Sequence, residues 1–542
     1  MFWYIKMDKL KFINTAIKTL PLDPIKENYV RTVPACFSIS YPTPITNPRL
    51  VHYSAEALAL LDLDQHEITK PLFSHYFCGN KILPGSQPVA HCYCGHQFGH
   101  FSGQLGDGRA HLLGEIINNR GERYELQLKG SGKTPYSRKG DGRAVLRSSI
   151  REFLCSEAMY HLEIPTTRAV TIITSDTYVD RDIKYNGNIT RERATVLSRV
   201  APTFIRFGSF QISDRGGPSY GNKEIIRKLL DYVILHQYPN IYNSNPSFEN
   251  RVIAFVEELT KRTANLVALW QCCGFTHGVL NTDNMSIIGY TMDYGPFGFM
   301  DNYDPDFISN TSDSDTGRYK YKNQAAVCKW NLEKLFQSIS YSVPTIQSKL
   351  NKILENFCVW YKNLYMDKMR KKLGLFYKFP EDELLVQQLL DTMHISSGDY
   401  TNIFRSLSQF QIFNNIEKQP VLEYILSQTQ IKSPDQIISN RNKWISWFNL
   451  YKKRIEKESQ LIQNPCNPNE RIQMMNSNNP RYILRNHLAQ RAIEKAENGD
   501  FTEVKRLLDV LRDPYDVSGK YHGSDYDKIP QKSAKIVLSC SS

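Results

Sequence analysis

The sequence predicts an α+β fold in which a sheet-containing N-terminal part precedes a mainly helical C-terminal part. From about residue 40 to residue 220, the chain is rich in glycine and in short β-prone runs, which is typical of strands joined by turns. Beyond residue 222, apolar residues recur at the spacing of amphipathic helices. The chain therefore changes from strands to helices before its middle.

Four runs in the first part are expected to form strands, with one helix among them. The first two runs flank Asn118-Asn119-Arg120-Gly121, whose amide side chains and glycine suit a hairpin turn. Apolar residues at helical spacing predict the helix between the second and third runs. The expected strands are 110–117, 124–128, 169–173 and 194–199, and the expected helix is 145–162.

The second part divides into six expected helices, a linker and a final helical segment. Asn and Pro are dense from residue 464 to 479, which favours a linker there. The expected helices are 223–236, 250–272, 323–339, 344–373, 381–393 and 442–458, followed by helices within 482–511. The predicted division is an N-terminal extension (1–39), a nucleotide-binding region (40–220), a helical region with the catalytic and metal loop (221–463), and a linker with helices and tail (464–542).

Composition excludes some functional classes and leaves others open. No run of 18 apolar residues occurs, so no membrane span is expected. An excess of 67 basic over 55 acidic residues attracts anions, but no nucleic-acid-binding module is recognisable, so no nucleic-acid partner is expected. Eleven cysteines without a regular framework suit a reducing compartment. Residues 1–19 carry a weak transit-peptide signal, and an ordinary first helix is the favoured interpretation.

A glycine turn and a strand lysine indicate a phosphate-binding site. Gly106, Gly108 and Arg109 precede an expected strand, and glycine there permits positive φ and close approach of backbone N–H groups to an anion. Lys129 ends the next strand, where a lysine can hold phosphate oxygens if a helix carboxylate such as Glu152 orients it. A plain loop and a solvated surface lysine are the alternatives.

The neighbouring glycines do not form a phosphate-binding P-loop. The string Gly130-Ser131-Gly132-Lys133-Thr134 lacks the required earlier glycine, because Gln127 occupies that position. Asp141 and Gly142, in contrast, lie just before the helix expected from residue 145, where backbone amides can face an anion.

Two arginines lie at the end of the last expected strand of the first part and shortly after it. Arg199 and Arg206 lie seven residues apart around Pro202. Two planar guanidinium groups could clamp a triphosphate tail, and structural ion pairing is the equal alternative.

The most specific local signal combines an acid, an amide and a second acid. Asp283 and Asn284 are adjacent, and Asp293 follows ten positions after Asp283, across an expected hairpin. Because Mg²⁺ takes one or two carboxylates together with substrate phosphates, Asn284 and Asp293 could hold it. Asp283 would remain free to accept the proton of an attacking hydroxyl. An Asx-rich loop is the alternative.

A rival set of residues contains thiols and imidazoles suitable for zinc. Its spacing is not a standard zinc pattern, so packing or loop roles are favoured. The set is Cys78, His91, Cys92, Cys94, His96 and His100.

Several ordered motifs together resemble the selenoprotein O family of protein adenylyltransferases, and the likeness extends from near Leu20 to the last residue. The motifs are Tyr93-Cys94-Gly95-His96-Gln97-Phe98-Gly99, Gly106–Arg109, Glu125–Gly132, Lys139–Arg151, Arg199–Gly208, Gly278–Gly295, Asn479-Pro480-Arg481-Tyr482 and Ser539-Cys540-Ser541-Ser542. The resemblance implies a two-lobed, protein-kinase-like fold that transfers AMP from ATP to Ser, Thr or Tyr hydroxyls of proteins, with Mg²⁺ and with Mn²⁺ left open. It also suggests mitochondria, with the cytoplasm as the alternative.

The resemblance assigns roles to residues already found. Asp283 is similar to the catalytic base, Asn284 and Asp293 to the metal ligands, and Glu152 to the partner of Lys129. The expected ATP-binding residues are Gly106, Gly108, Arg109, Lys129, Asp141, Gly142, Arg199, Arg206 and Asp293.

Two other functions stay open from the sequence. Direct analogy with kinases is unsafe because Asn284 follows the base immediately, not five residues later, yet γ-phosphoryl transfer is the enzymatic alternative. Cys540 occupies the place of selenocysteine in many animal members of the family, so a redox-regulating thiol protein without catalysis is the alternative of another class.

Overall fold

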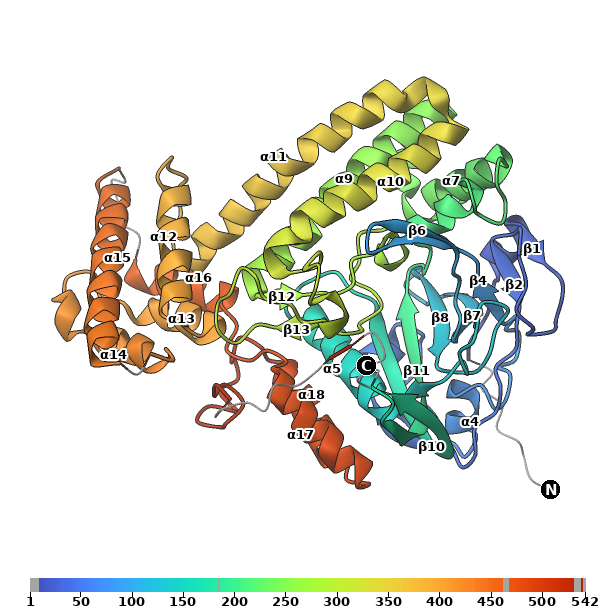
Figure 1. The fold of residues 1–542 in the computed structure, drawn as a ribbon, viewed down its shortest axis with the longest axis horizontal. Coiled ribbons are helices and arrows are strands. Elements are labelled where there is room, and N and C mark those ends of the chain that lie inside the picture. Colours follow the sequence, from blue (N-terminus) through green and yellow to red (C-terminus); the bar gives the residue numbers. More distant parts are fainter. Residues whose placement is uncertain (1–8, 183–185, 432, 462–466, 531–537, 540–542) are drawn as a thin grey trace.

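The computed structural model describes residues 9–182, 186–431, 433–461, 467–530 and 538–539. Strands gather in the N-terminal lobe and long helices in the C-terminal lobe (Figure 1). This arrangement confirms the predicted two-lobed, protein-kinase-like α+β fold. Within the described residues, no helix combines the length and apolar character needed to cross a bilayer.

The N-terminal lobe contains a sheet with the order β1-β2-β4-β7-β8-β11-β10-β3, and β9 pairs with β11. Neighbouring strands are antiparallel except β1 and β2. The strands are β1 (Leu22–Asp23), β2 (Phe37–Ile39), β3 (Arg49–Tyr53), β4 (Val89–His91), β7 (Ala110–Ile117), β8 (Arg123–Lys129), β9 (Ala144–Val145), β10 (Arg168–Asp182) and β11 (Ile189–Ala201). The first two come from residues before 40, within the expected N-terminal extension.

The β7–β8 hairpin confirms the predicted turn. Gly121 adopts φ +76°, and the amide of Asn118 donates to the carbonyl oxygen of Glu122 over 3.0 Å. On β8, Leu126 and Leu128 are buried in a core with residues of α2 to α4, so Lys129 and Gln127 lie on the other face. That second face points toward the C-terminal lobe.

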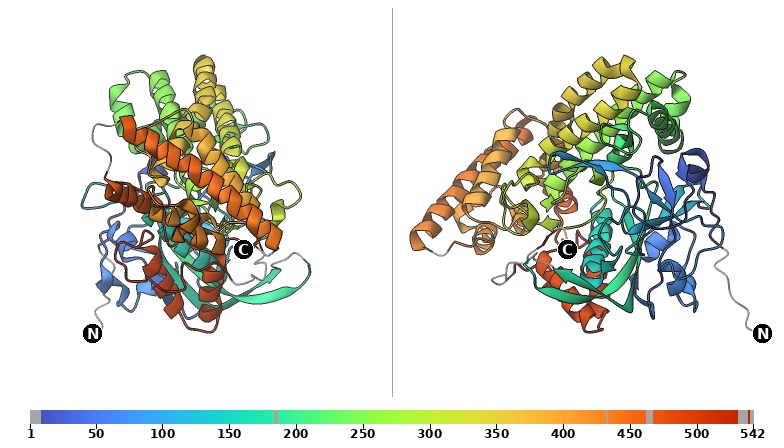
Figure 2. Two further views of the ribbon diagram at one scale, coloured as in Figure 1. Left: turned by 90° about the vertical axis from the view of Figure 1, so that its left-hand side faces the viewer. Right: turned by 45° about the vertical axis from the view of Figure 1, so that its right-hand side comes forward.

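The C-terminal lobe is built around long helices. α9 begins after Ser247, whose hydroxyl caps the amide of Asn250, and ends at Gly274 with φ +73°. α9 packs side by side with α10 and α11 (Figures 1 and 2). The helices of the chain are α1 (Thr15–Thr19), α2 (Ala55–Ala59), α3 (Gln65–Ile68), α4 (Phe73–Phe77), α5 (Leu146–His161), α6 (Phe207–Phe210), α7 (Lys223–Gln237), α8 (Pro239–Ser244), α9 (Phe248–Cys273), α10 (Gln324–Ser342), α11 (Gln347–Lys372), α12 (Asp382–Ile395), α13 (Tyr400–Ser406), α14 (Pro420–Ser427), α15 (Pro434–Leu461), α16 (Pro468–Asn478), α17 (Asn486–Glu497) and α18 (Thr502–Leu511).

The predicted linker is wrong over most of its described length, because residues 468–478 form α16. Asn467 caps the amide of Asn469, and Pro468 occupies the first turn, so the Asn and Pro that suggested a linker start a helix instead. Met475 of α16 is fully buried in the core shared by α12 to α15.

The last two helices return to the N-terminal lobe. α17 and α18 pack against α5, and one hydrophobic core includes Phe153 of α5, Ala489 of α17 and Leu507 of α18 (Figures 1 and 2). The buried Arg485, just before α17, donates to both carboxylate oxygens of Asp399 over 2.8 and 3.0 Å. The segment is thereby tied to both lobes.

Candidate active site

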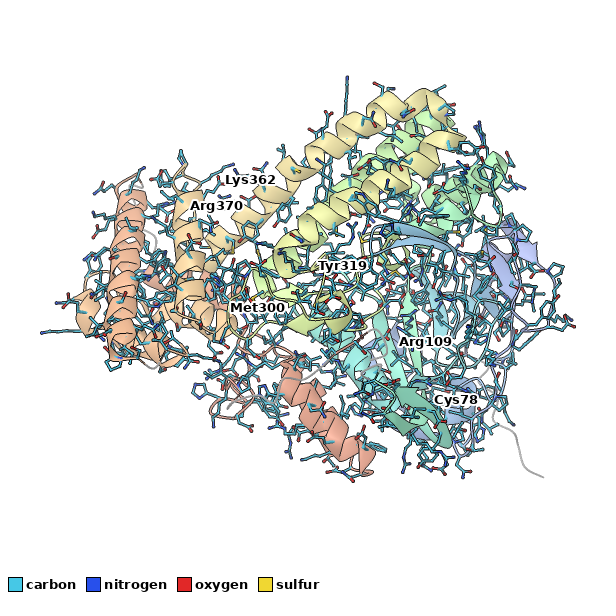
Figure 3. The ribbon with its side chains drawn as sticks, viewed as in Figure 1. Cys78, Arg109, Met300, Tyr319, Lys362 and Arg370 are labelled. Atoms are coloured by element: carbon cyan, nitrogen blue, oxygen red, sulfur yellow. The ribbon has the colours of Figure 1, made fainter. Side chains whose placement is uncertain are left out.

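A cavity of about 780 Å³ lies where the two lobes meet, and this size suits a nucleotide. The strand-rich lobe contributes Arg109, labelled in Figure 3, and the helical lobe contributes residues of the segment 279–296. Glu152 and Arg206 lie behind the wall, in contact with residues that line it. The other predicted catalytic, ATP-binding and metal-binding residues all line the cavity: Gly106, Gly108, Arg109, Lys129, Asp141, Gly142, Arg199, Asp283, Asn284 and Asp293.

The glycine turn packs tightly at the cavity edge. Gly106 has φ +75°, and a Cβ at this position would overlap the ring of Tyr136. The amide of Gly106 donates to the carbonyl oxygen of Tyr93 over 3.1 Å, and that of Asp107 to His91 over 2.9 Å. The positive φ agrees with the prediction, but these two amides are engaged within the protein.

Four charged side chains meet at the inner end of the cavity. Lys129 of β8 donates to Glu152 of α5 over 2.7 Å and contacts Asp293 at 3.3 Å. Arg199 of β11 donates to Glu152 over 2.9 Å and to Asp293 over 2.5 Å. The cross-strand neighbours β8 and β11 therefore present both cations to the same two carboxylates.

Arg206 joins this cluster from the start of α6. Its Nη1 donates to Asp293 Oδ2 over 2.6 Å and to the carbonyl oxygen of Asp283 over 2.8 Å. Burial of Asp293 favours its neutral form, but Arg199, Arg206 and Lys129 outweigh it and hold the pKa of Asp293 well below its ordinary value. Asp293 is therefore the common counter-ion of three cations.

The loop after α9 carries the predicted base. Asp283 and Asn284 lie in a short 3₁₀ turn, Thr282–Asn284. The expected hairpin across this segment is wrong, since Ser286 pairs with Arg206 and Thr291 pairs with Thr166. Burial raises the pKa of Asp283 to about 6, which favours proton acceptance near neutral pH.

Asn284 and Asp293 are the predicted metal ligands, and both carboxylate oxygens of Asp293 contact the three cations. Both side chains line the cavity, and the Asn284 amide nitrogen is turned away to donate to the carbonyl oxygen of Val279 over 2.9 Å. Asn284 is thus fixed in the orientation that leaves its side-chain oxygen for a ligand. Among the described residues, no three His, Cys, Asp or Glu form a metal-binding group. A hard ion held by few protein oxygens together with phosphates is compatible with this set.

The outer end of the cavity contains a residue that the sequence analysis missed. Arg181 of β10 donates to both oxygens of Asp141, over 2.6 and 3.0 Å, and to the carbonyl oxygen of Arg143. The adjacent Gly142 has φ +73°, and a Cβ there would overlap the backbone of Gly132. No motif surrounds Arg181, so only the β10–β11 pairing reveals its place.

Comparison with known proteins identifies the family. The family model described as "Protein adenylyltransferase SelO" matches residues 26–512. The chain belongs to the SelO family. It is 45% identical to "Protein adenylyltransferase SelO-1, mitochondrial" of Danio rerio, over 94% of this chain and 86% of the relative. It is 44% identical to "Protein adenylyltransferase SelO, mitochondrial" of Homo sapiens (93% and 87%) and 40% identical to "Protein nucleotidyltransferase YdiU" of Azoarcus sp. (99% and 100%).

Of the cysteines and histidines that suggested zinc, Cys78, His91, Cys92 and Cys94 are buried, whereas His96 is partly buried and His100 is exposed. Burial raises the pKa of the Cys78 thiol to about 11. His91 packs edge-on against Phe37 at a ring distance of 4.7 Å. Cys540, on which the thiol-regulator alternative depends, lies outside the described residues.

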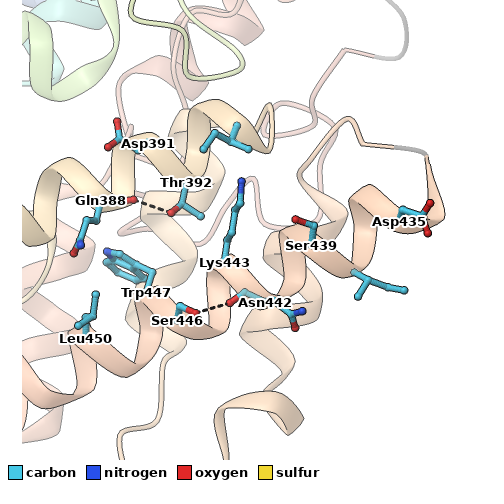
Figure 4. Close-up of a pocket in the computed structure, with 12 residues that line it drawn as sticks. Gln388, Asp391, Thr392, Asp435, Ser439, Asn442, Lys443, Ser446, Trp447 and Leu450 are labelled. Carbon is cyan, nitrogen blue, oxygen red and sulfur yellow. Dashed lines mark hydrogen bonds between the residues drawn. The ribbon is translucent and has the colours of Figure 1, made fainter.

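A second hollow of about 630 Å³ lies between α12 and α15 (Figure 4). Trp447 and Lys443 line one side, and Asp391 the other. None of the predicted site residues contributes to it.

Proposed function

We propose that this chain transfers AMP from ATP to hydroxyl groups of proteins, with Asp283 as the base. As a member of the SelO family it is a nucleotidyltransferase that acts on proteins. The observation that carries the residue roles is the meeting of Lys129, Arg199 and Asp293 with Asp283 in one cavity. Three buried cations favour an anionic ligand with several charges, and a triphosphate has them.

In the proposed reaction, each bond that forms is matched by a bond that breaks. The acceptor oxygen forms a bond to the α-phosphorus, the bond from that phosphorus to the β-phosphate oxygen breaks, and pyrophosphate leaves. Asp283 receives the proton of the acceptor hydroxyl. Lys129, Arg199 and Arg206 stabilise the negative charge that develops on the phosphate oxygens. Because these cations are already held in place, little reorganisation is needed when the charge develops.

The remaining predicted contacts belong to the nucleotide and the metal ion. Asn284 and Asp293 would hold Mg²⁺ or Mn²⁺, which neutralises phosphate charge when bound. Gly106, Gly108 and Arg109 lie at one side of the cavity, and Asp141 and Gly142 at its outer end. The ATP-binding role of these five residues stays a prediction.

Labelled ATP tests the proposal. A protein acceptor is incubated with the chain and with ATP carrying the label at either the α or the γ phosphate. Protein label from the α position alone is expected, and label from the γ position alone would contradict AMP transfer and support the kinase alternative. Asp283→Asn should abolish labelling. Asp315→Asn is the matched control, because Asp315 is an exposed carboxylate that does not line the cavity.

The compartment and the non-protein partners stay predictions. The vertebrate relatives are named as mitochondrial proteins, whereas the name of the Azoarcus relative gives no compartment. We propose mitochondria for this chain, with the cytoplasm as the alternative, and import into isolated mitochondria with removal of N-terminal residues is the expected result.

We propose no nucleic-acid partner. The thiol-regulator alternative depends on Cys540, and Cys540→Ser should leave AMP transfer intact.

A further inference from the structure

A small hairpin of the N-terminal lobe crosses to the catalytic loop of the other lobe. It consists of β5 (Cys94–Gln97) and β6 (His100–Gln104), which form a two-stranded sheet of their own. Phe98 and Gly99 at its tip have φ +50° and +88°, as a tight turn with positive φ at both central residues requires. Residues 94–99 of this hairpin belong to one of the motifs that resemble the family, but none of them is among the predicted site residues.

The hairpin backbone is bonded to the loop that carries Asp283. The amide of His96 donates to Thr282 Oγ1 over 2.8 Å, and the amide of Phe98 donates to the hydroxyl of Tyr319, also over 2.8 Å. Gln211, which is fully buried, braces both partners: its amide nitrogen lies 3.0 Å from His96 Nδ1, and its oxygen accepts from Thr282 over 2.6 Å. The hairpin and the loop thus form one hydrogen-bonded unit.

The hairpin also encloses the carboxylate of Asp283. Gln97 Nε2 donates to Asp283 Oδ2 over 3.1 Å. On the other side Gly95 touches Oδ1, and a Cβ at Gly95 would overlap this oxygen. Within the described part of the chain, Oδ1 is buried and has no hydrogen-bond partner. Gln97 is therefore the residue whose side chain bonds the Asp283 carboxylate, and Gly95 leaves the carboxylate no room on its opposite side.

We infer that Gln97 is a positioning residue for the base: its amide fixes the Asp283 carboxylate in one rotamer, so that the oxygen needed by the acceptor hydroxyl is presented to the cavity. The inference rests on the proposed role of Asp283. Gly95 and Gln97 are two residues apart, so strand alternation places both on the face of the hairpin toward Asp283. Arg206 donates a hydrogen bond to the backbone carbonyl oxygen of Asp283, and Gln97 donates one to its side chain.

Substitution of Gln97 with methionine tests the inference, because methionine keeps the length of the side chain but lacks the N–H donor. Loss of a hydrogen bond to a charged group should lower kcat by about 10- to 100-fold. The KM for ATP should change less than about 3-fold, because no phosphate-binding cation is touched. Gln97→His retains an N–H donor and is expected to recover kcat to within about 10-fold of the wild type.

Gln104 supplies the matched control on the same hairpin. Its amide donates to the carbonyl oxygen of Arg31 and its oxygen accepts from Val33, so Gln104→Met disturbs the hairpin without touching Asp283. Its kcat should stay within about 3-fold of the wild type. An equal loss in Gln104→Met and Gln97→Met would show that hairpin stability alone matters, and would overturn the inference.

Two readouts separate this inference from the proposed function. If the wild type transfers the γ instead of the α label, AMP transfer fails, but the effect of Gln97→Met on kcat still applies, because a hydroxyl acceptor needs the base in either reaction. A crystal structure of Gln97→Met provides the second readout. An Asp283 side chain that keeps its rotamer there would overturn the inference without any activity measurement, and a changed or disordered rotamer supports it.

Discussion

Replacement of Asp293 with alanine should strengthen binding of metal-free ATP while it abolishes transfer. Asp293 lies 2.5 Å from Arg199, 2.6 Å from Arg206 and 3.3 Å from Lys129, and all three cations are almost fully buried. In the wild type, metal-free ATP must compete with this carboxylate for the cations and is repelled by its charge. The variant removes both obstacles, so the phosphates become the counter-ion that the cluster lacks.

The contacts that remain set the magnitude. Removal of one partner of a buried ion pair costs about 3–5 kcal/mol. Glu152 still contacts Lys129 and Arg199, at 2.7 and 2.9 Å, so the cost should lie near the lower end, about 3 kcal/mol. Arg206 keeps the carboxylate of Asp107 at 3.5 Å and its hydrogen bond to the carbonyl oxygen of Asp283. If bound phosphates recover half of this loss, Kd for metal-free ATP falls about 10-fold.

Isothermal titration with ATP in the presence of a chelator measures this change, with Asp315→Ala as the control for loss of an exposed carboxylate. A thermal-shift assay gives a second reading, since metal-free ATP should raise the Tm of Asp293→Ala more than that of the wild type. With Mg²⁺ present, AMP transfer by the variant should be undetectable. Unchanged or weaker binding of metal-free ATP by the variant would refute the view that Asp293 occupies the phosphate-binding cations.

Three further changes address the base, a buried acid and the returning segment. Gly95→Ala should lower the initial rate of AMP transfer about 100-fold with ATP binding retained, because the added Cβ displaces the carboxylate of Asp283. Burial and the nearby Glu115 raise the pKa of Glu125 to about 8, so the stability that its neutral form supports is complete below its ordinary value of 4.5 and is lost as pH rises toward 8. Urea unfolding of Glu125→Gln should match the wild type at pH 5 and show a higher free energy of unfolding at pH 9. Arg485→Met leaves the buried Asp399 unpaired and should lower the free energy of unfolding by about 3–5 kcal/mol, measured by the same method.

Local signals were sufficient to predict the elements but not how they assemble. The hairpin at Gly121 and the helix that became α5 were predicted closely, because turn residues and helical spacing lie within short stretches of chain. The linker was wrong for the same reason: Asn467 and Pro468 are loop residues by composition but helix starters in context. Composition alone cannot separate these two uses.

The candidate site shows the same division. Lys129 and Asp293 could be singled out because a strand lysine and spaced acids suggest phosphate and metal chemistry. Arg181 was missed as a site residue because no motif surrounds it, and Gln97 was missed because the motif that contains it assigned it no role. Arg181 reaches Asp141 only through strand pairing, and Gln97 bonds a residue 186 positions later. Long-range partners become visible only in three dimensions.

The placement of α5 shows how distant segments control the site. Glu152 faces Lys129 and Arg199, and its neighbour Arg151 donates to the carbonyl oxygen of Phe297 over 2.7 Å and to Asn486 of α17 over 3.3 Å. Phe297 follows Asp293 by four residues, so one turn of α5 connects the cluster of Lys129 and Arg199, the segment proposed to hold the metal ion, and the returning C-terminal helices. A shift of α5 would separate Glu152 from both cations at once. The helices α17 and α18 therefore stabilise the geometry of the site, although neither lines the cavity.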